Sequence, residues 1–194
     1  MATKHDLLST LRSVQAGSIS PEEALLQMKL APFEDLGYAK VDYHRAVRQG
    51  ASEVIYGQSK TPEHIAGILE AMQRRDSSNI LVTRIEQKTA DWLAERFPLR
   101  YEPLAKLAVV LPRPTEQRGA IAVITGGTSD IGVAEEAAIT AETLGNRVTR
   151  LYDVGVAGLH RLLSQLEPLM KARVVVAVAG MEGALASVVG GLVD

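Results

Sequence analysis

Three short stretches in the second half of the chain join glycines to polar side chains, and each follows an apolar run. The first is Gly126-Gly127-Thr128-Ser129-Asp130, directly after AIAVIT. Glycines let the backbone approach a ligand closely, and hydroxyl and carboxylate groups at the start of a helix can donate or accept hydrogen bonds. This corner predicts a site for an anionic, nucleotide-like ligand. The alternative interpretation is that Ser129 or Asp130 only caps the helix that follows.

The other two stretches, YDVGVAGLHRL and AVAGMEGALA, place charged residues at equivalent points. Their candidate ligand-binding residues are Asp153, His160, Arg161, Gly180, Met181, Glu182 and Gly183. Taken singly, such residues are more often helix caps or solvated surface groups. Because all three stretches come at the ends of consecutive apolar runs, we predict that they line one small-molecule pocket. Glu182 is the candidate for general acid–base chemistry.

Alternating strands and helices are expected to position these residues. The predicted strands are 120–125, 147–155 and 173–180, and the predicted helices are 130–144, 157–172 and 183–193. This order is typical of right-handed crossovers and of a parallel sheet with helices on both faces, in which all strand ends meet at one edge. The expected fold class is therefore α/β, with a doubly wound parallel sheet. Since such sheets usually have more than three strands, we expect this one to be incomplete at its C-terminal end.

The first half of the chain predicts a small mixed α/β domain. Ser20-Pro21 and Thr61-Pro62 are helix-start signals. The predicted strands are 38–45, 52–57, 79–85 and one at the end of 104–112, with a further helix at 89–97. The stretch 111–120 has two prolines and a glycine and is interpreted as a linker. We therefore predict domains at 1–112 and 113–194.

Composition excludes several classes of function. The 194 residues contain no cysteine, so this chain has no disulfide, thiolate metal site or thiol nucleophile of its own. With a net charge of −2, the chain lacks the positive charge expected of a nucleic-acid-binding protein. No signal peptide or membrane span is expected, so we predict a cytoplasmic location. His5, His44 and His64 lack metal-ligand spacing, and no metal site is predicted. Arg45 and Lys60 are further candidates for phosphate contacts.

The second half resembles the aminoimidazole ribonucleotide carboxylases of purine biosynthesis, the PurE type. Gly127-Thr128-Ser129-Asp130 is similar to their Gly-Ser-x-Ser-Asp corner, and GLHRL, with His160 and Arg161, is loosely similar to their Ser-Ala-His-Arg loop. The serine of that loop is replaced here, and Glu182 stands in the third loop. These departures, together with LGYAKVDYHRAVRQGASEVIYGQSKT, look like the LarB family, which performs the first step of nickel-pincer nucleotide biosynthesis for lactate racemase maturation. The resemblance covers nearly all of the chain.

The resemblance implies a reaction. The protein would carboxylate pyridinium C5 of nicotinic acid adenine dinucleotide, with CO2 or bicarbonate as co-substrate, and hydrolyse the phosphoanhydride to give pyridinium-3,5-biscarboxylic acid mononucleotide and AMP. NAD is expected to bind as an analogue of the substrate. The resemblance implies no tightly bound cofactor, and a requirement for Mg2+ is compatible with it. A cysteine thiolate is expected to activate the ring from a segment after residue 194, so this chain alone is expected to be inactive.

The resemblance also implies roles and partners. The 126–130 corner would hold the ribose-phosphate, His160 and Arg161 would face phosphate or carboxylate, and Glu182 would act near C5. We expect a homo-oligomer, for example an octamer like those of PurE-like proteins. No nucleic acid or membrane partner is expected. Two alternatives stay open: an aminoimidazole ribonucleotide carboxylase or mutase, and a nucleotide-binding module without chemistry.

Overall fold

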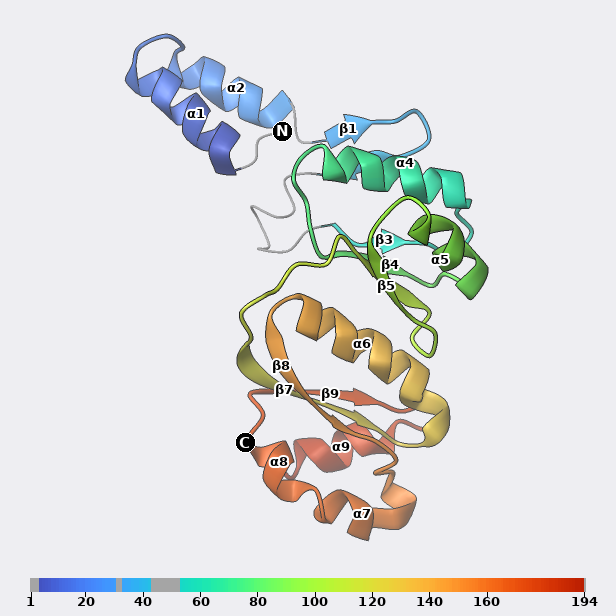
Figure 1. The fold of residues 1–194 in the computed structure, drawn as a ribbon. Helices are drawn as coiled ribbons and strands as arrows, with labels where there is room; N and C mark the ends of the chain where they lie inside the picture. The colour runs from blue at the N-terminus through green and yellow to red at the C-terminus, as the bar shows by residue number, and fades with distance from the viewer. Residues whose placement is uncertain (1–3, 31–32, 43–52, 194) are drawn as a thin grey trace.

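The computed structural model describes residues 4–30, 33–42 and 53–193 (Figure 1). It begins with two helices, α1 (Lys4–Gln15) and α2 (Pro21–Leu30), which contact each other. The start of α2 is a reciprocal cap: Glu23 N–H donates to Ser20 Oγ at 3.0 Å, and Ser20 N–H donates to Glu23 Oε2 at 2.8 Å. The predicted cap at Ser20 is confirmed.

A short antiparallel pair follows, formed by β1 (Phe33–Asp35) and β2 (Lys40–Asp42). The predicted strand at 38–45 is confirmed over the residues of β2, whereas β1 was not predicted. His44 and Arg45 lie outside the described residues, so the predicted phosphate contact of Arg45 stays a prediction.

Among the described residues, a four-stranded sheet forms the centre of the first half, in the order β3-β4-β6-β5. Its strands are β3 (Ile55–Tyr56), β4 (Ile80–Thr83), β5 (Leu99–Glu102) and β6 (Leu107–Val110). The pair β3–β4 is parallel, and β6 is antiparallel to both of its neighbours. Helices α4 (Pro62–Gln73) and α5 (Gln87–Ala94) cover one face.

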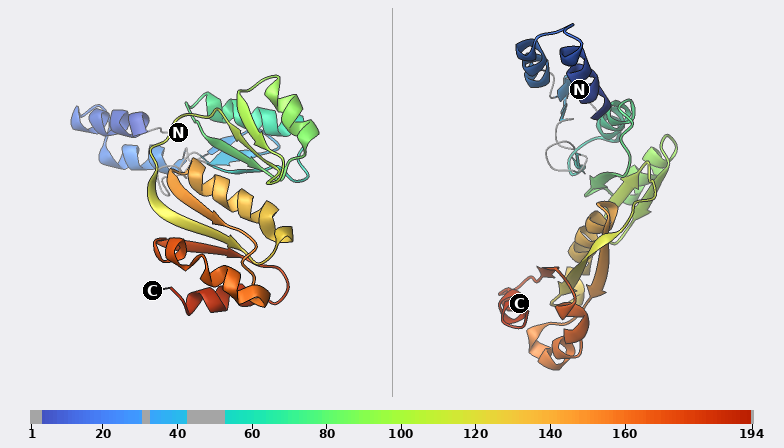
Figure 2. Two further views of the ribbon diagram at one scale, coloured as in Figure 1. Left: turned by 60° about the horizontal axis from the view of Figure 1, so that its bottom comes forward. Right: turned by 90° about the vertical axis from the view of Figure 1, so that its left-hand side faces the viewer.

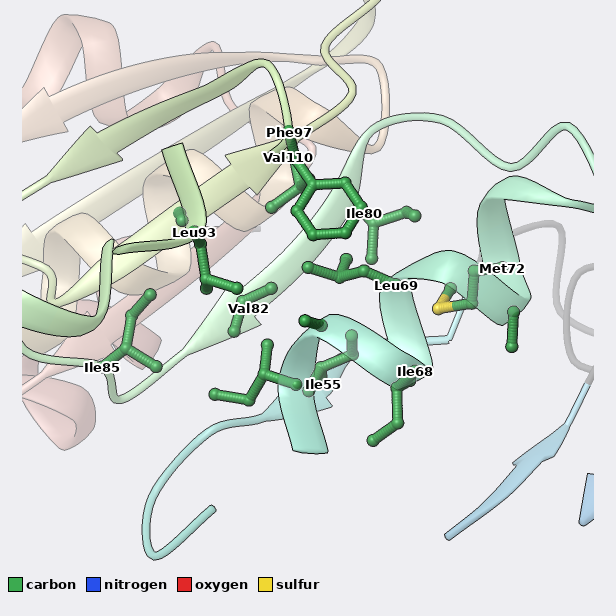
Figure 3. Close-up of a cluster of buried hydrophobic side chains, with 14 of the residues drawn as sticks. Ile55, Ile68, Leu69, Met72, Ile80, Val82, Ile85, Leu93, Phe97 and Val110 are labelled. Atoms are coloured by element: carbon green, nitrogen blue, oxygen red, sulfur yellow. The ribbon is translucent and has the colours of Figure 1, made fainter. Parts of the chain in front are cut away.

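Helix α4 forms where the sequence predicts it, because Thr61 Oγ1 accepts from His64 N–H and Pro62 occupies the first turn. Its apolar face, which includes Leu69, packs on Ile80, Val82 and other buried residues of the sheet (Figure 3). This cluster is the larger hydrophobic core of the described chain and lies away from the predicted pocket.

The second half holds a parallel sheet, in the order β8-β7-β9 among the described residues. Its strands are β7 (Arg118–Thr125), β8 (Asn146–Leu151) and β9 (Val174–Val178). Its helices are α6 (Ile131–Thr143), α7 (Leu159–Leu163), α8 (Leu166–Met170) and α9 (Ala184–Gly190). In β7, Val123 packs with α6, whereas Ala122 and Ile124 pack with the helices of the other face. The predicted parallel pairing with helices on both faces is therefore seen.

Helix α6 also packs on the four-stranded sheet. Ile139 of α6 is buried with Leu81, Leu107 and Val109, and Glu136 of α6 lies 3.0 Å from Arg84. Helix α6 is thus a layer between the two sheets, as the views in Figure 2 show. The two halves share this layer, while the boundary at residue 112 stays a prediction.

Two predicted elements of the second half differ in extent. Strand β8 ends at Leu151 rather than at 155, because Asp153 has a left-handed φ of 58° that no strand continues. The predicted helix 157–172 is divided into α7 and α8. Pro168 has no amide hydrogen to donate to the carbonyl of Ser164, four residues earlier, and its ring crowds that carbonyl, which favours the break between α7 and α8.

Strand β5 was not predicted, and the predicted helix 89–97 lies at Gln87–Ala94. In the part of the chain that the structure describes, no helix is both long and apolar enough to cross a membrane.

Candidate functional site

The predicted corner joins β7 to α6 through a single 3-10 turn, Thr128–Asp130. The Asp130 carboxylate turns back and accepts from Gly127 N–H at 3.0 Å, while Gly126 N–H donates to the carbonyl of Val178 at 3.0 Å. Both glycine amides are therefore already used, and neither is left to bind an anion. The Asp130 carboxylate therefore stabilises the corner itself. This role is similar to the alternative interpretation, in which Asp130 only caps the helix.

A cavity of about 310 Å³ lies at this corner. The predicted residues that line it are Gly126, Gly127, Ser129, Asp130, Arg161, Gly180, Met181, Glu182 and Gly183. Gly155, Val156, Ala157, Ala179, Ala184 and Leu185 complete the lining, and Thr128 is not part of it. All three predicted stretches therefore contribute to one cavity at the carboxyl ends of the strands.

Asp130 lies where the first and third stretches meet. A Cβ atom built on Gly126 would lie 3.5 Å from Asp130 Oδ2, and one built on Gly180 would lie 3.5 Å from Asp130 Oδ1. The carboxylate is thus flanked by two glycine backbones from different loops.

The second stretch is tied to the first by a partly buried hydrogen bond, and its own Asp153 and Arg161 form a half-exposed ion pair. Asp153 N–H donates to the buried Thr125 Oγ1 at 2.9 Å, and Asp153 Oδ2 lies 2.5 Å from Arg161 Nη1. This ion pair orients the Arg161 guanidinium at the edge of the cavity. Among the described residues that line this cavity, Arg161 is the single positively charged one.

The structure does not place every residue of the second stretch in the predicted single pocket. Asp153 and His160 line a separate cavity of about 560 Å³, together with Arg150, Leu151, Tyr152, Val154, Ser164 and Gln165. Arg161 lines both cavities. Two cavities that share Arg161 thus lie where the sequence predicts one pocket, and His160 lines the second. The reason is that neighbouring residues of a helix point about 100° apart.

Two glycines that the sequence analysis did not select make this arrangement possible. A Cβ on Gly155 would lie 2.3 Å from the carbonyl oxygen of Gly126, and a Cβ on Gly158 would lie 2.6 Å from Arg161 Nε. Gly155 lets two loops of the site touch, and Gly158 leaves room for the guanidinium. The available signal was the three-residue spacing of Gly155, Gly158 and Arg161 in the sequence.

Glu182 lies in the loop between β9 and α9. Within the described residues its carboxylate has no hydrogen bond or ion pair, although it lines the first cavity. The adjacent Met181 is fully exposed, and Gly183 adopts the left-handed φ of 68° that turns the chain into α9. Glu182 is thus an exposed carboxylate at the rim of the cavity.

The charges around the first cavity are mixed: Asp130 and Glu182 are acidic, and Arg161 is basic but paired with Asp153. This arrangement suits a ligand that carries a positive group near the two carboxylates and a negative group near Arg161. It is less suited to a purely anionic ligand.

A second charged cluster, also missed at the sequence level, joins α6 to β8. Arg150 bonds Glu135 at 3.1 Å and Glu142 at 2.5 and 3.0 Å, and Tyr152 donates to Glu135 at 2.8 Å. The hydrogen bonds to Glu142 raise the pKa of Arg150, and burial together with the bond to Glu135 raises the pKa of Tyr152. The sequence gives little indication of this cluster, because Arg150 and Tyr152 are well separated along the chain from Glu135 and Glu142.

Two other candidates lie away from the cavities. Lys60 Nζ donates to the carbonyl of Tyr56 at 2.8 Å, beside the four-stranded sheet, and lines neither cavity, so its predicted phosphate contact is not part of this site. His64 stacks on Tyr38 with ring centroids 4.4 Å apart. No group of three potential metal ligands occurs in the described residues.

The fold is that of an α/β protein with a cavity at the carboxyl ends of parallel strands. Residues 33–112 match the model of the LarB/PurE-like N-terminal domain. The chain is also 35% identical over 201 residues to the uncharacterized protein MJ0165 of Methanocaldococcus jannaschii, covering 97% of this chain and 78% of that relative. The chain belongs to the LarB/PurE-like family, which suggests a carboxylase-type function.

Proposed function

We propose that the protein carboxylates pyridinium C5 of nicotinic acid adenine dinucleotide and hydrolyses its phosphoanhydride, giving pyridinium-3,5-biscarboxylic acid mononucleotide and AMP. CO2 or bicarbonate is the co-substrate. The observation that carries the proposal is the convergence of Asp130, Glu182 and Arg161 on one cavity. Family membership supports the carboxylase class.

The substrate has the charge distribution that this cavity suits. Its pyridinium ring is cationic, and its carboxylate and phosphates are anionic. In the proposed pose the ring lies beside Asp130 and Glu182, and an anionic group lies at Arg161, with the Ser129 hydroxyl as a further donor. Because both glycine amides of the corner are used within the protein, side chains rather than the backbone of the glycines would bind the phosphate.

Glu182 is the proposed base. Carboxylation replaces the C5 hydrogen by a carboxylate, so a proton must leave C5, and an unpaired carboxylate in the cavity can accept it. The ring carbon must first become electron-rich. The resemblance assigns this to addition of a thiolate, which these 194 residues do not contain. In the proposed step C5 attacks CO2, Glu182 takes the C5 proton, and the thiolate leaves as the aromatic ring is restored.

The same proposal covers the setting of the reaction. The protein works as a homo-oligomer in the cytoplasm, without nucleic acid or membrane, and the sheet β8-β7-β9 is part of a doubly wound PurE-like domain that starts at residue 113. The family membership and the parallel strand order support the PurE-like domain. The oligomer, the location and the partners rest on the resemblance alone.

Calorimetry on the full-length protein tests the substrate. Nicotinic acid adenine dinucleotide should bind at least about tenfold more tightly than its uncharged-ring dihydro form, because the two carboxylates favour the cation. Tighter binding of aminoimidazole ribonucleotide would replace the proposal by the purine carboxylase alternative. Binding of the dinucleotide with no product by mass spectrometry would instead indicate a binding module.

Glu182→Gln tests the base. Turnover should fall by roughly 100-fold or more, the usual scale for a lost acid–base group, while dinucleotide affinity changes by less than about threefold. The matched control is Glu167→Gln, which removes an exposed carboxylate on α8 that is paired with Lys171. An equal loss of affinity and turnover in Glu182→Gln would show that Glu182 serves binding alone.

A further inference from the structure

The first turn of α6 lies close to the turn between β5 and β6, residues 103–106. A Cβ atom on Gly132 would lie 2.9 Å from the carbonyl oxygen of Leu104. Carbon atoms do not approach a backbone oxygen this closely without displacing it, so only glycine fits at this point of α6. In Figure 1 the β5–β6 turn extends toward the end of α6 that follows the corner.

The β5–β6 turn is itself held in place. Lys106 N–H donates to the carbonyl of Pro103, and the carbonyl of Lys106 accepts from Ile85 N–H at 3.0 Å. Lys106 Nζ lies 2.7 Å from Glu86 Oε1. Because these partners belong to the four-stranded sheet unit, the Leu104 carbonyl is a fixed point of that unit.

Two further contacts lie on the same face of α6. Gly132, Glu136 and Ile139 are spaced by four and three residues, which places them on one side of a helix. Glu136 pairs with Arg84 at 3.0 Å, and Ile139 is buried against the four-stranded sheet. The four-stranded sheet therefore contacts α6 over about two turns, beginning at Gly132.

Gly132 comes two residues after Asp130, whose carboxylate bonds Gly127 N–H and lines the first cavity. We propose that the β5–β6 turn sets the position of the Gly126–Asp130 corner through Gly132, which makes Gly132 a positioning residue for the site. Any displacement of the first turn of α6 moves Asp130 and opens its bond to Gly127. Gly132 has this role whichever ligand the cavity binds.

Hydrogen exchange of the Gly127 amide measures this directly in the full-length protein. Gly132→Ala should accelerate that exchange by about tenfold or more, because the added methyl group forces the turn and α6 apart. The matched control is Gly190→Ala, at a helical glycine of α9 where a Cβ meets nothing within 4 Å. It should leave the Gly127 exchange rate within about twofold. Equal rates in the two variants would overturn the proposal.

A second pair of variants separates positioning from loss of folding. Lys106 has a left-handed φ of 49°, so Lys106→Gly relaxes the turn that carries the Leu104 carbonyl. Alone it should accelerate Gly127 exchange about threefold, and added to Gly132→Ala it should restore at least half of the lost protection. A merely destabilised protein would lose protection further in the double variant.

A second measurement, of ligand binding, rests on the proposed function. Calorimetry with nicotinic acid adenine dinucleotide should show about tenfold weaker binding by Gly132→Ala than by Gly190→Ala. If the wild-type protein does not bind this dinucleotide, the proposed function fails, and the exchange experiment still decides the role of Gly132.

Discussion

The two sheets that sandwich α6 differ in how completely they are buried. Every residue of β4 and β6, in the four-stranded sheet, is buried. In its edge strands β3 and β5, only Ile55 is buried. In the parallel sheet the last four residues of the central strand β7 are buried, but only Leu151 of β8 is and no residue of β9 is, within the described residues. The sheet that carries the candidate site is therefore the less protected one.

This difference separates the source of stability from the place of the chemistry. Burial of apolar surface is the main favourable term in folding, and it is concentrated around α4 and the four-stranded sheet. The candidate cavity lies at open strand ends and is lined mostly by short side chains, which contribute little burial. Helix α6, packed on both sheets, lets the well-packed unit support the site.

The largest expected effect comes from the core of the four-stranded sheet. Leu69 and Leu162 are both 0% exposed, one in each unit. Leu69→Ala should lower the free energy of unfolding by about 4 kcal/mol, and Leu162→Ala by about 2 to 3 kcal/mol. The smaller cost follows because many neighbours of Leu162 are only partly buried and can move into the space. Urea denaturation measures both values.

The exposed Leu163 supplies the control for this pair, since Leu163→Ala removes a side chain that is 47% exposed. It should change stability by less than about 0.5 kcal/mol. A cost for Leu162→Ala as large as that for Leu69→Ala would contradict the contrast between the sheets.

An intermediate effect is expected where the site is tightest. Gly155→Ala places a methyl group against the Gly126 carbonyl, a backbone atom that cannot rotate away. Overpacking of this kind costs about 1 to 3 kcal/mol, and dinucleotide binding should fall with it. Gly190→Ala is again the control, and it should be neutral or stabilising by up to about 1 kcal/mol, as for alanine in a helix. If Gly155→Ala binds normally, the Gly126–Gly155 contact is not needed for the site.

Much of this fold could be predicted because the patterns are local. Thr61 at the start of α4 and the apolar runs of β7 and β9 are signals within a few residues. Strand β5 could not be predicted in this way. Its sequence, LRYE, alternates apolar and polar residues, but over four residues only, which is too short to identify a strand. It is a strand because it pairs with β6, for example Leu99 with Val110. That pairing is a tertiary contact.

The candidate site shows the same division. Glycines next to polar residues after a strand identify the three loops, and the parallel order brings them together. The local sequence cannot predict toward which cavity a side chain points. His160 and Arg161 are adjacent, yet of the two only Arg161 lines the first cavity. Nor could it predict the contact of Gly132 with Leu104, which depends on how α6 lies on the other sheet.

The smallest expected effect is a pH dependence that again compares the sheets. Tyr152, after β8, donates to the Glu135 carboxylate, and Tyr101, in β5, donates to the carbonyl of Ile85. Burial raises the pKa of both phenols, and the bond to Glu135 raises that of Tyr152 further. In the unfolded chain a tyrosine ionises near pH 10, so above about pH 10 the folded protein holds more protons than the unfolded chain, and stability falls as pH rises.

The contribution of each raised pKa is therefore fully present below about pH 10 and is lost progressively above it. Tyr152→Phe should reduce the slope of unfolding free energy against pH between about pH 9.5 and 11, by at most about one proton. Tyr101→Phe should reduce it less, because its acceptor is a neutral carbonyl. Urea denaturation across this range measures the slopes. Equal slopes for Tyr152→Phe and the wild type would show that the Glu135 carboxylate does not hold this phenol neutral, and that the charged cluster on α6 is open to solvent like the rest of the parallel sheet's edge.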